Sequence, residues 1–161
     1  MTISKGDRLP AATLIRNGAN GPEDVQLADL TKGRKVVIFA VPGAFTPTCH
    51  SAHVPSFIRT KAQFDAKGVD EIMCISVNDP FVMKAWGDVT GANDAGISML
   101  ADPGDFTKAL GLSFDAPARG LIGRSKRYAM YVVDGTVNVL HMEESPGTCE
   151  VSGGESMLAA I

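Results

Sequence analysis

The stretch VVIFAV at residues 36–41 is a continuous apolar run that is rich in β-branched residues. Such a run is typical of a strand that is buried on both faces, as in a parallel sheet. A second run of this kind, IMCISV, follows at residues 72–77. We therefore expect two buried strands at the centre of the molecule, and the rest of the fold is built outward from them.

Each apolar run is followed by a turn and then by a stretch with helical spacing. The first predicted helix begins near Thr46. Its apolar side is formed by Val54, Phe57, Ile58 and Phe64. The second begins at Asp79-Pro80, a capping residue followed by a proline at the first helical position, and carries Phe81, Val82 and Trp86. The order strand, helix, strand, helix predicts a parallel β-α-β core with right-handed crossovers.

The last third of the chain has a different pattern. Two strand-like runs, residues 128–133 and 136–140, are separated by Asp134-Gly135, the strongest short-range signal for a β-hairpin. A final helix is expected near residues 155–160. The absence of repeats and linkers favours a single domain over residues 1–161. We therefore predict an α/β protein with a thioredoxin-like fold, a mixed central β-sheet flanked by helices.

Composition narrows the functional classes. The chain has 161 residues, of which 45% are apolar and 20% charged, and its formal net charge is -3. No basic stripe indicates nucleic-acid binding, and the longest apolar run is too short to span a membrane. The N-terminus lacks the pattern of a signal peptide, so a cytoplasmic location is expected. Three cysteines are too few, and odd in number, for a secreted disulfide scaffold.

Cys49 stands out because of its place in the chain. Thr46 reads as a helix N-cap and Pro47 as the first helical residue, which puts Cys49 near the third helical position, close to backbone N–H groups without helical partners. An ordinary thiol is only a few per cent thiolate at neutral pH. A helix N-terminus contributes up to ~2 kcal/mol towards ionisation, so a nearby cation is needed to complete it. The alternative is that Cys49 is an inert buried side chain.

A longer motif surrounds this cysteine. Pro42, Thr46 and Cys49 spell P-x-x-x-T-x-x-C within the string VPGAFTPTCHSAHVPSF at residues 41–57. This string resembles the active-site signature of the peroxiredoxins, specifically the type II group, also called atypical two-cysteine or peroxiredoxin-five-like. The resemblance extends to segments spread over nearly the whole chain, namely residues 6–10, 76–86, 100–103, 126–128 and 133–135.

The resemblance implies a thiol peroxidase that reduces hydrogen peroxide and alkyl hydroperoxides in antioxidant defence and redox homeostasis. Cys49 would be the peroxidatic cysteine and would become a sulfenic acid. Arg127 would hold the thiolate, Thr46 would bond the peroxide or the thiolate, and Pro42 would shield the site from water. The N–H groups around Ala44 and Cys49 would bind substrate oxygens. No cofactor is implied; thioredoxin or glutathione with glutaredoxin would be the reductant, and the protein would be a homodimer.

The fate of the sulfenic acid is open at this level. Cys74 matches the second cysteine of some type II members but lies in a predicted buried strand, and Cys149 lies in a late loop with a weaker match. Attack on the sulfenic acid by an external thiol needs neither cysteine. We rank this route first, a disulfide with Cys74 second and a disulfide with Cys149 third. His50 and His53 beside Cys49 offer too few ligands for a metal site, so we expect none and interpret both as surface or packing residues that modestly tune the site.

Two other functions compete with a peroxidase. A thiol–disulfide exchange protein on the same fold normally carries C-x-x-C, but Cys49 is followed by His50-Ser51-Ala52. A redox sensor, in which oxidised Cys49 changes partner binding, is compatible with the sequence. Catalytic consumption of peroxide with added reductant separates these functions, since a sensor stops after one equivalent.

Overall fold

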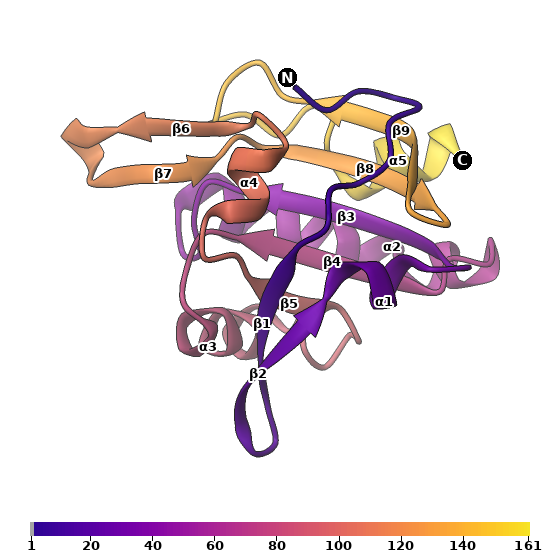
Figure 1. Ribbon diagram of the computed structural model, residues 1–161, viewed down its shortest axis with the longest axis horizontal. Coiled ribbons are helices and arrows are strands. Elements are labelled where there is room, and N and C mark those ends of the chain that lie inside the picture. Colours follow the sequence, from indigo (N-terminus) through magenta and orange to yellow (C-terminus); the bar gives the residue numbers. More distant parts are fainter. Residues whose placement is uncertain (1) are drawn as a thin grey trace.

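The computed structural model describes residues 2–161. Its centre is a seven-stranded sheet with the strand order β2-β1-β5-β4-β3-β8-β9 (Figure 1). The two apolar runs form β3 (Lys35–Val41) and β4 (Glu71–Ser76), which pair in parallel, and β5 (Ser98–Ala101) extends this parallel core. The other strands are β1 (Thr13–Gly18), β2 (Gly21–Gln26), β6 (Ser113–Ala116), β7 (Leu121–Ser125), β8 (Tyr128–Val133) and β9 (Thr136–Met142).

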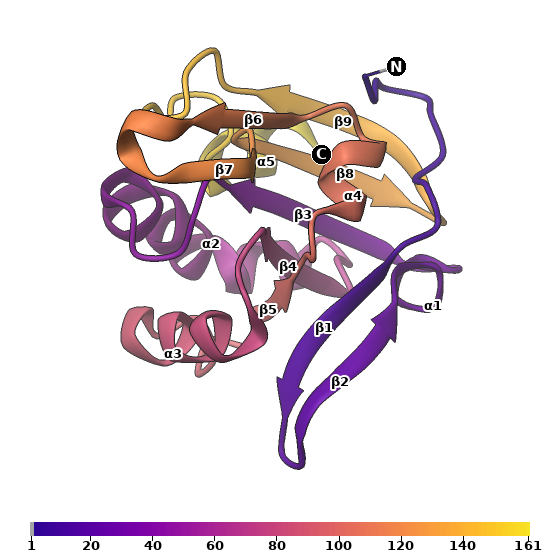
Figure 2. The same cartoon turned by 60° about the vertical axis from the view of Figure 1, so that its left-hand side comes forward.

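Helices cover both faces of the sheet (Figures 1 and 2). They are α1 (Leu27–Thr31), α2 (Val54–Ala66), α3 (Pro80–Thr90), α4 (Asp105–Ala109) and α5 (Gly154–Ala160). A π-helical turn, η1 (Cys49–His53), precedes α2, and a 3₁₀ turn, η2 (Pro117–Arg119), lies between β6 and β7. None of the helices formed by residues 2–161 has the length and apolar character needed to cross a membrane.

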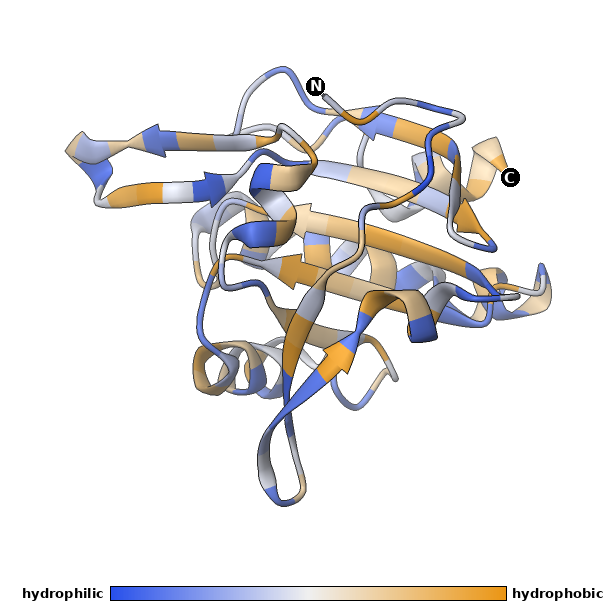
Figure 3. Cartoon of the chain, in the orientation of Figure 1, coloured by the Kyte–Doolittle hydropathy of each residue, from blue (hydrophilic) through white to orange (hydrophobic). Residues whose placement is uncertain are grey.

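Alternate residues of β3 belong to two separate cores, which explains its unbroken apolar sequence (Figure 3). Val37, Phe39 and Val41 pack in one core with residues of α2, α3 and α5. Val36, Ile38 and Ala40 pack in the other, with residues of α1, α4 and β8. A strand buried on both faces needs apolar residues at every position. The predicted mixed sheet flanked by helices is therefore confirmed.

The predicted hairpin is also confirmed. β8 pairs antiparallel with β3 and with β9, which adds an antiparallel edge to the parallel core. Asp134 and Gly135 have φ values of 48° and 78°. Positive φ at both central residues is the mark of a type I′ turn, whose twist matches that of the flanking strands.

Two further hairpins were not predicted. β1 and β2 form one at the edge of the main sheet, and β6 and β7 form a separate two-stranded sheet. β2 has the sequence GPEDVQ and is largely exposed. A strand with no buried face shows no alternation of apolar and polar residues, so periodicity alone misses it.

Candidate active site

The candidate site begins where β3 ends, in the loop of residues 42–46. The helix that follows starts at Pro47, and the N–H of His50 donates to the carbonyl of Thr46 at 2.9 Å. Cys49 is thus the third helical residue, as predicted. Phe45 has a φ of 65°, a conformation that non-glycine residues rarely adopt. Backbone strain of this kind clusters at functional sites.

The helix does not continue as a regular α-helix. Residues Cys49–His53 form a π-helical turn, in which the N–H of Val54 donates to the carbonyl of Cys49, five residues back. Pro55 has no N–H and its ring would clash with the carbonyl of Ser51 in a regular helix, so a widened turn suits this position. This turn was not predicted from the sequence. The turn leaves both Cys49 and His53 buried.

The sulfur of Cys49 receives two side-chain contacts. Thr46 Oγ1 lies 2.7 Å and Arg127 Nη2 lies 3.0 Å from it. Thr46 Oγ1 is also 2.7 Å from the carbonyl of Gly43, and a hydroxyl has only one proton to share between these acceptors. The hydroxyl therefore donates to a thiolate, or donates to Gly43 while it accepts from the thiol. The predicted role of Thr46 as a side-chain helix cap is wrong, because its hydroxyl faces the sulfur and Gly43.

Arg127 is the most unusual charge in the site, because its side chain is 1% exposed. Nε and Nη2 donate to the carbonyl of Pro146 at 3.2 and 2.9 Å, and Nη1 contacts Nδ1 of His53 at 2.9 Å. Within residues 2–161 it makes no ion pair with a carboxylate. A buried guanidinium without a counter-ion favours a negative charge on whatever it touches, and here that is Cys49.

His53 orients the arginine. Its Nδ1 accepts from Arg127, which leaves the proton on Nε2, and Nε2 donates to the carbonyl of Ser152 at 2.9 Å. Burial and the neighbouring charge of Arg127 lower the pKa of His53 to about 3. The ring is therefore neutral, as its contact with a cation requires. His53 is thus a packing residue that acts on the site through Arg127, which agrees with the expected tuning role, but it is buried and does not lie on the surface.

His50 has a different environment. Its Nδ1 accepts a hydrogen bond from Nε1 of Trp86 on α3 at 3.1 Å, so this nitrogen is engaged with the indole. Among residues 2–161, no three His, Cys, Asp or Glu side chains are grouped in a way that would hold a metal ion.

The loop between β9 and α5 is held by Glu143. This carboxylate accepts from the N–H groups of Glu150, Val151 and Ser152 at 2.6–2.9 Å, and from the hydroxyl of Ser152 at 2.6 Å. Burial raises the pKa of Glu143, but these hydrogen bonds outweigh burial and keep the pKa below its usual value. The loop in turn supplies the two carbonyls that hold Arg127 and His53. Glu143 was not identified from the sequence, because no local motif connects it to Cys49.

Pro42 is buried beside the site, and its carbonyl accepts from Nη1 of Arg124 at 3.1 Å. A Cβ on Gly43 would lie 2.5 Å from that same nitrogen, so a larger residue there would displace the guanidinium of Arg124. The N–H of Ala44 donates to Oδ1 of Asn78 at 3.0 Å. This N–H therefore has a side-chain partner within the protein, and substrate binding by the N–H groups around Ala44 and Cys49 stays a prediction.

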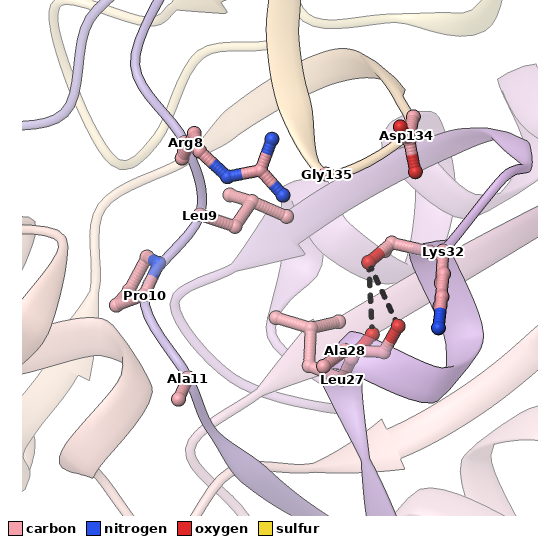
Figure 4. Close-up of a pocket in the computed structure, with 10 residues that line it drawn as sticks. Arg8, Leu9, Pro10, Ala11, Leu27, Ala28, Lys32, Asp134 and Gly135 are labelled. Atoms are coloured by element: carbon pink, nitrogen blue, oxygen red, sulfur yellow. Dashed lines mark hydrogen bonds between the residues drawn. The ribbon is translucent and has the colours of Figure 1, made fainter.

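A hollow of about 360 Å³ opens beside the sulfur's two partners. It is lined by Pro42, Thr46, Pro47, Thr48, Arg119, Leu121, Arg127, Pro146 and Gly147. A somewhat larger hollow, about 410 Å³, lies near Arg8, Lys32 and Asp134 (Figure 4). Thr46 and Arg127, the two side chains that contact the Cys49 sulfur, line the first hollow and not the second, so the candidate chemistry belongs to the first one.

The other two cysteines differ in their surroundings. Cys74 is fully buried in β4 opposite Phe39, and burial raises its pKa well above that of an ordinary thiol. Cys149 lies half-buried in the loop after β9, and burial raises its pKa as well. Both are free thiols, as is Cys49. Neither has the positively charged contact that marks a reactive cysteine.

Comparison with known proteins agrees with this geometry. A family model described as Redoxin matches residues 4–158. Peroxiredoxin-2E-2, a chloroplastic protein of Oryza sativa subsp. japonica, is 48% identical over 99% of this chain and 73% of its own length. Peroxiredoxin-2C of the same organism is 45% identical over 99% of this chain and 98% of its own. Reduced Prx3 from Vibrio vulnificus, solved with H2O2, is 49% identical, covers 99% of both chains and has a TM-score of 0.92.

Proposed function

Because this chain belongs to the peroxiredoxins and is a thiol peroxidase with an antioxidant function, we propose that Cys49 is its peroxidatic residue. Arg127 and Thr46 act on the sulfur, and Pro42 excludes water from it. One observation carries this assignment. The Cys49 sulfur is contacted by a buried arginine that has no carboxylate partner within residues 2–161.

The proposed step is a displacement at oxygen. The thiolate of Cys49 attacks the terminal oxygen of the hydroperoxide, an S–O bond forms and the O–O bond breaks. The sulfur loses two electrons and becomes a sulfenic acid, while the leaving oxygen takes a proton to give water or an alcohol. As negative charge moves onto the peroxide oxygens, Arg127 stabilises it, which is the role of a preorganised donor.

The experiment that tests the assignment compares three single variants. Cys49→Ser should abolish the turnover of hydrogen peroxide in the presence of dithiothreitol. Cys74→Ser and Cys149→Ser should retain the first oxidation, measured as loss of one thiol equivalent in stopped flow. Catalytic peroxide consumption by the Cys49→Ser protein would overturn the proposal.

For regeneration we propose direct attack on the sulfenic acid by an external thiol, such as glutathione with glutaredoxin, ahead of thioredoxin and an internal disulfide. The position of Cys74 supports this order, since a residue in a central strand reaches a helix start only after local unfolding. Cys149 lies in an irregular loop and has fewer contacts to break. Mass mapping after one peroxide equivalent, with added glutathione, should show a mixed disulfide at Cys49. Rapid formation of an internal disulfide would reverse this ranking.

We further propose a homodimer that forms through the surface beside the active-site loop. Phe45 is 49% and Phe81 61% exposed, and the Phe45 ring lies 6.4 Å from that of Trp86 on α3, the helix that carries Phe81. Exposed aromatic side chains are enriched at protein interfaces. Phe81→Asp should shift the sedimentation coefficient to that of a monomer, whereas Val89→Asp at the far end of α3 serves as control.

A cytoplasmic location is also proposed. The three cysteines are free thiols, which suits a reducing compartment. Fluorescence of the tagged protein in its own cells, or cell fractionation, tests this directly. Recovery in an organelle, as the name of the chloroplastic relative would suggest for that protein, would contradict it.

A further inference from the structure

We propose that Arg119, at the mouth of the active-site hollow, binds the carboxylate of an organic ligand whose other end reaches Cys49. The inference deepens the proposed function, on which it rests, by naming the chemical class that the site prefers. The carboxylate has two possible sources, a carboxylate-bearing hydroperoxide or glutathione.

Arg119 is placed by the connection between β6 and β7. It is the last residue of η2, and the turn is closed by the N–H of Gly120, which donates to the carbonyl of Pro117 at 3.0 Å. Gly120 has a φ of 72°, so the chain reverses directly after the arginine. The β6–β7 hairpin projects on the side where β3 ends and α2 begins (Figures 1 and 2). The Arg119 side chain thereby lines the same hollow as Thr46 and Arg127.

The guanidinium of Arg119 has no partner among residues 2–161. The other two arginines at the site are engaged, Arg124 with the carbonyl of Pro42 and Arg127 with Pro146 and the sulfur. Asp115, the acidic residue of the same hairpin, accepts from the N–H of Gly123 at 2.6 Å. Arg119 therefore keeps its planar set of donors available, and this set matches a carboxylate in two parallel hydrogen bonds.

The other residues that line the hollow favour a ligand whose two polar ends are joined by an apolar part. Pro42, Pro47, Leu121 and Pro146 contribute apolar surface to the hollow that Arg119 and Arg127 also line. A volume of about 360 Å³ is in the range of small-molecule sites. Hydrogen peroxide has neither an apolar part nor a charge, so it gains nothing from Arg119. An amphipathic acid gains from both.

The test uses Arg119→Gln with Lys108→Gln as the matched control, since Lys108 is exposed on α4 and its loss changes net charge equally. With dithiothreitol as reductant, kcat/KM is measured for linoleic acid hydroperoxide, its methyl ester and hydrogen peroxide. Loss of a charge-assisted hydrogen bond predicts a fall of about tenfold or more for the acid in Arg119→Gln. The ester and hydrogen peroxide should stay within about twofold, and Arg119→Lys should recover part of the loss because it keeps the charge.

A second arm separates the two sources of carboxylate. Hydrogen peroxide is the oxidant, and glutathione is compared with its diethyl ester as reductant. A selective loss with free glutathione would assign Arg119 to the reductant, and a selective loss with the hydroperoxide acid would assign it to the substrate. Equal effects on acid and ester in both arms would overturn the proposal. Such a result would leave the role of Cys49 untouched, since that role is tested by Cys49→Ser with hydrogen peroxide.

Discussion

At the scale of single residues, Arg127 and the start of the helix act on the same sulfur with different strength. The Nη2 atom of Arg127 lies 3.0 Å from Sγ of Cys49. Opposite unit charges about 4 Å apart attract by about 4 kcal/mol at an effective dielectric constant of about 20. A helix N-terminus contributes at most ~2 kcal/mol. No backbone N–H within residues 2–161 donates to the sulfur, so the arginine is the larger influence.

Arg127→Gln should therefore slow the oxidation of Cys49 by peroxide. The removal of one preorganised charged donor predicts a loss of about 10²–10³ in the rate constant for peroxide. Stopped-flow oxidation at neutral pH gives this rate constant. Arg59→Gln is the control, because Arg59 forms an exposed ion pair with Glu155 on the surface. An unchanged rate constant in Arg127→Gln would remove this residue from the mechanism.

At the scale of elements, the irregular loop between β9 and α5 contributes as much to the site as the helix does. Its Pro146 and Ser152 carbonyls accept from Arg127 and His53. The loop has no regular secondary structure to fix its shape over residues 143–150, and the buried Glu143 carboxylate gathers its N–H groups instead. Glu143 is thus a positioning residue that acts on Cys49 through the loop and Arg127.

Glu143→Gln should weaken this arrangement while it keeps the shape of the side chain. A neutral amide accepts less strongly than a carboxylate, and its NH₂ group would face other donors, so we expect a loss of about 1–3 kcal/mol in the free energy of unfolding. Peroxide oxidation of Cys49 should slow several-fold, and limited proteolysis should cut within residues 144–152. Glu144→Gln is the control, because the neighbouring Glu144 is exposed. If the two variants behave alike in all three assays, Glu143 has no positioning role.

At the scale of the whole molecule, the sheet separates two cores, and the active site sits at the edge of one of them. Cys49 is a member of the core that includes Phe39 and Phe57, and the His53 ring packs on Phe39 with centroids 4.9 Å apart. Cys49 and His53 are therefore part of the packed interior. A change in the charge of His53 consequently affects the stability of the whole fold.

Acidification should destabilise the protein through His53. The pKa of His53 is about 3 in the folded protein and has its ordinary value of 6.5 in the unfolded chain. Between pH 3 and pH 6.5 the unfolded chain therefore binds a proton that the folded protein does not. The resulting stability is present above pH 6.5 and falls as pH drops, by about 1.4 kcal/mol per pH unit. The free energy of unfolding, measured in urea, should therefore fall between pH 7 and pH 5. This fall should be about 2 kcal/mol larger in the wild type than in His53→Gln. His50→Gln should retain the wild-type difference; if His53→Gln also retains it, His53 is not the group responsible.

Much of the fold could be predicted because its signals are local. The apolar run of β3, the Asp79-Pro80 start of α3 and the Asp134-Gly135 turn each act on neighbouring residues, and the structure confirms all three. The β1–β2 and β6–β7 hairpins were missed because their strands are short or partly exposed and lack the long apolar runs of β3 and β4. For the site, the position of Cys49 in the helix was predictable from Thr46-Pro47, whereas Arg127 entered only through the family resemblance.

The sequence by itself determined the β-α-β core, the late hairpin, the helix start that carries Cys49 and, through its motif, the family. These features depend on backbone preferences and on the burial of apolar residues within short segments. Both can be inferred from the order of neighbouring residues. Only the tertiary structure decided which groups meet at the sulfur. Arg127 lies 78 residues from Cys49 in the chain, and the Ser152 carbonyl lies 99 residues from His53. Contacts at such separations arise from the packing of whole elements, and the hydrogen bonds that join them leave no pattern along the sequence.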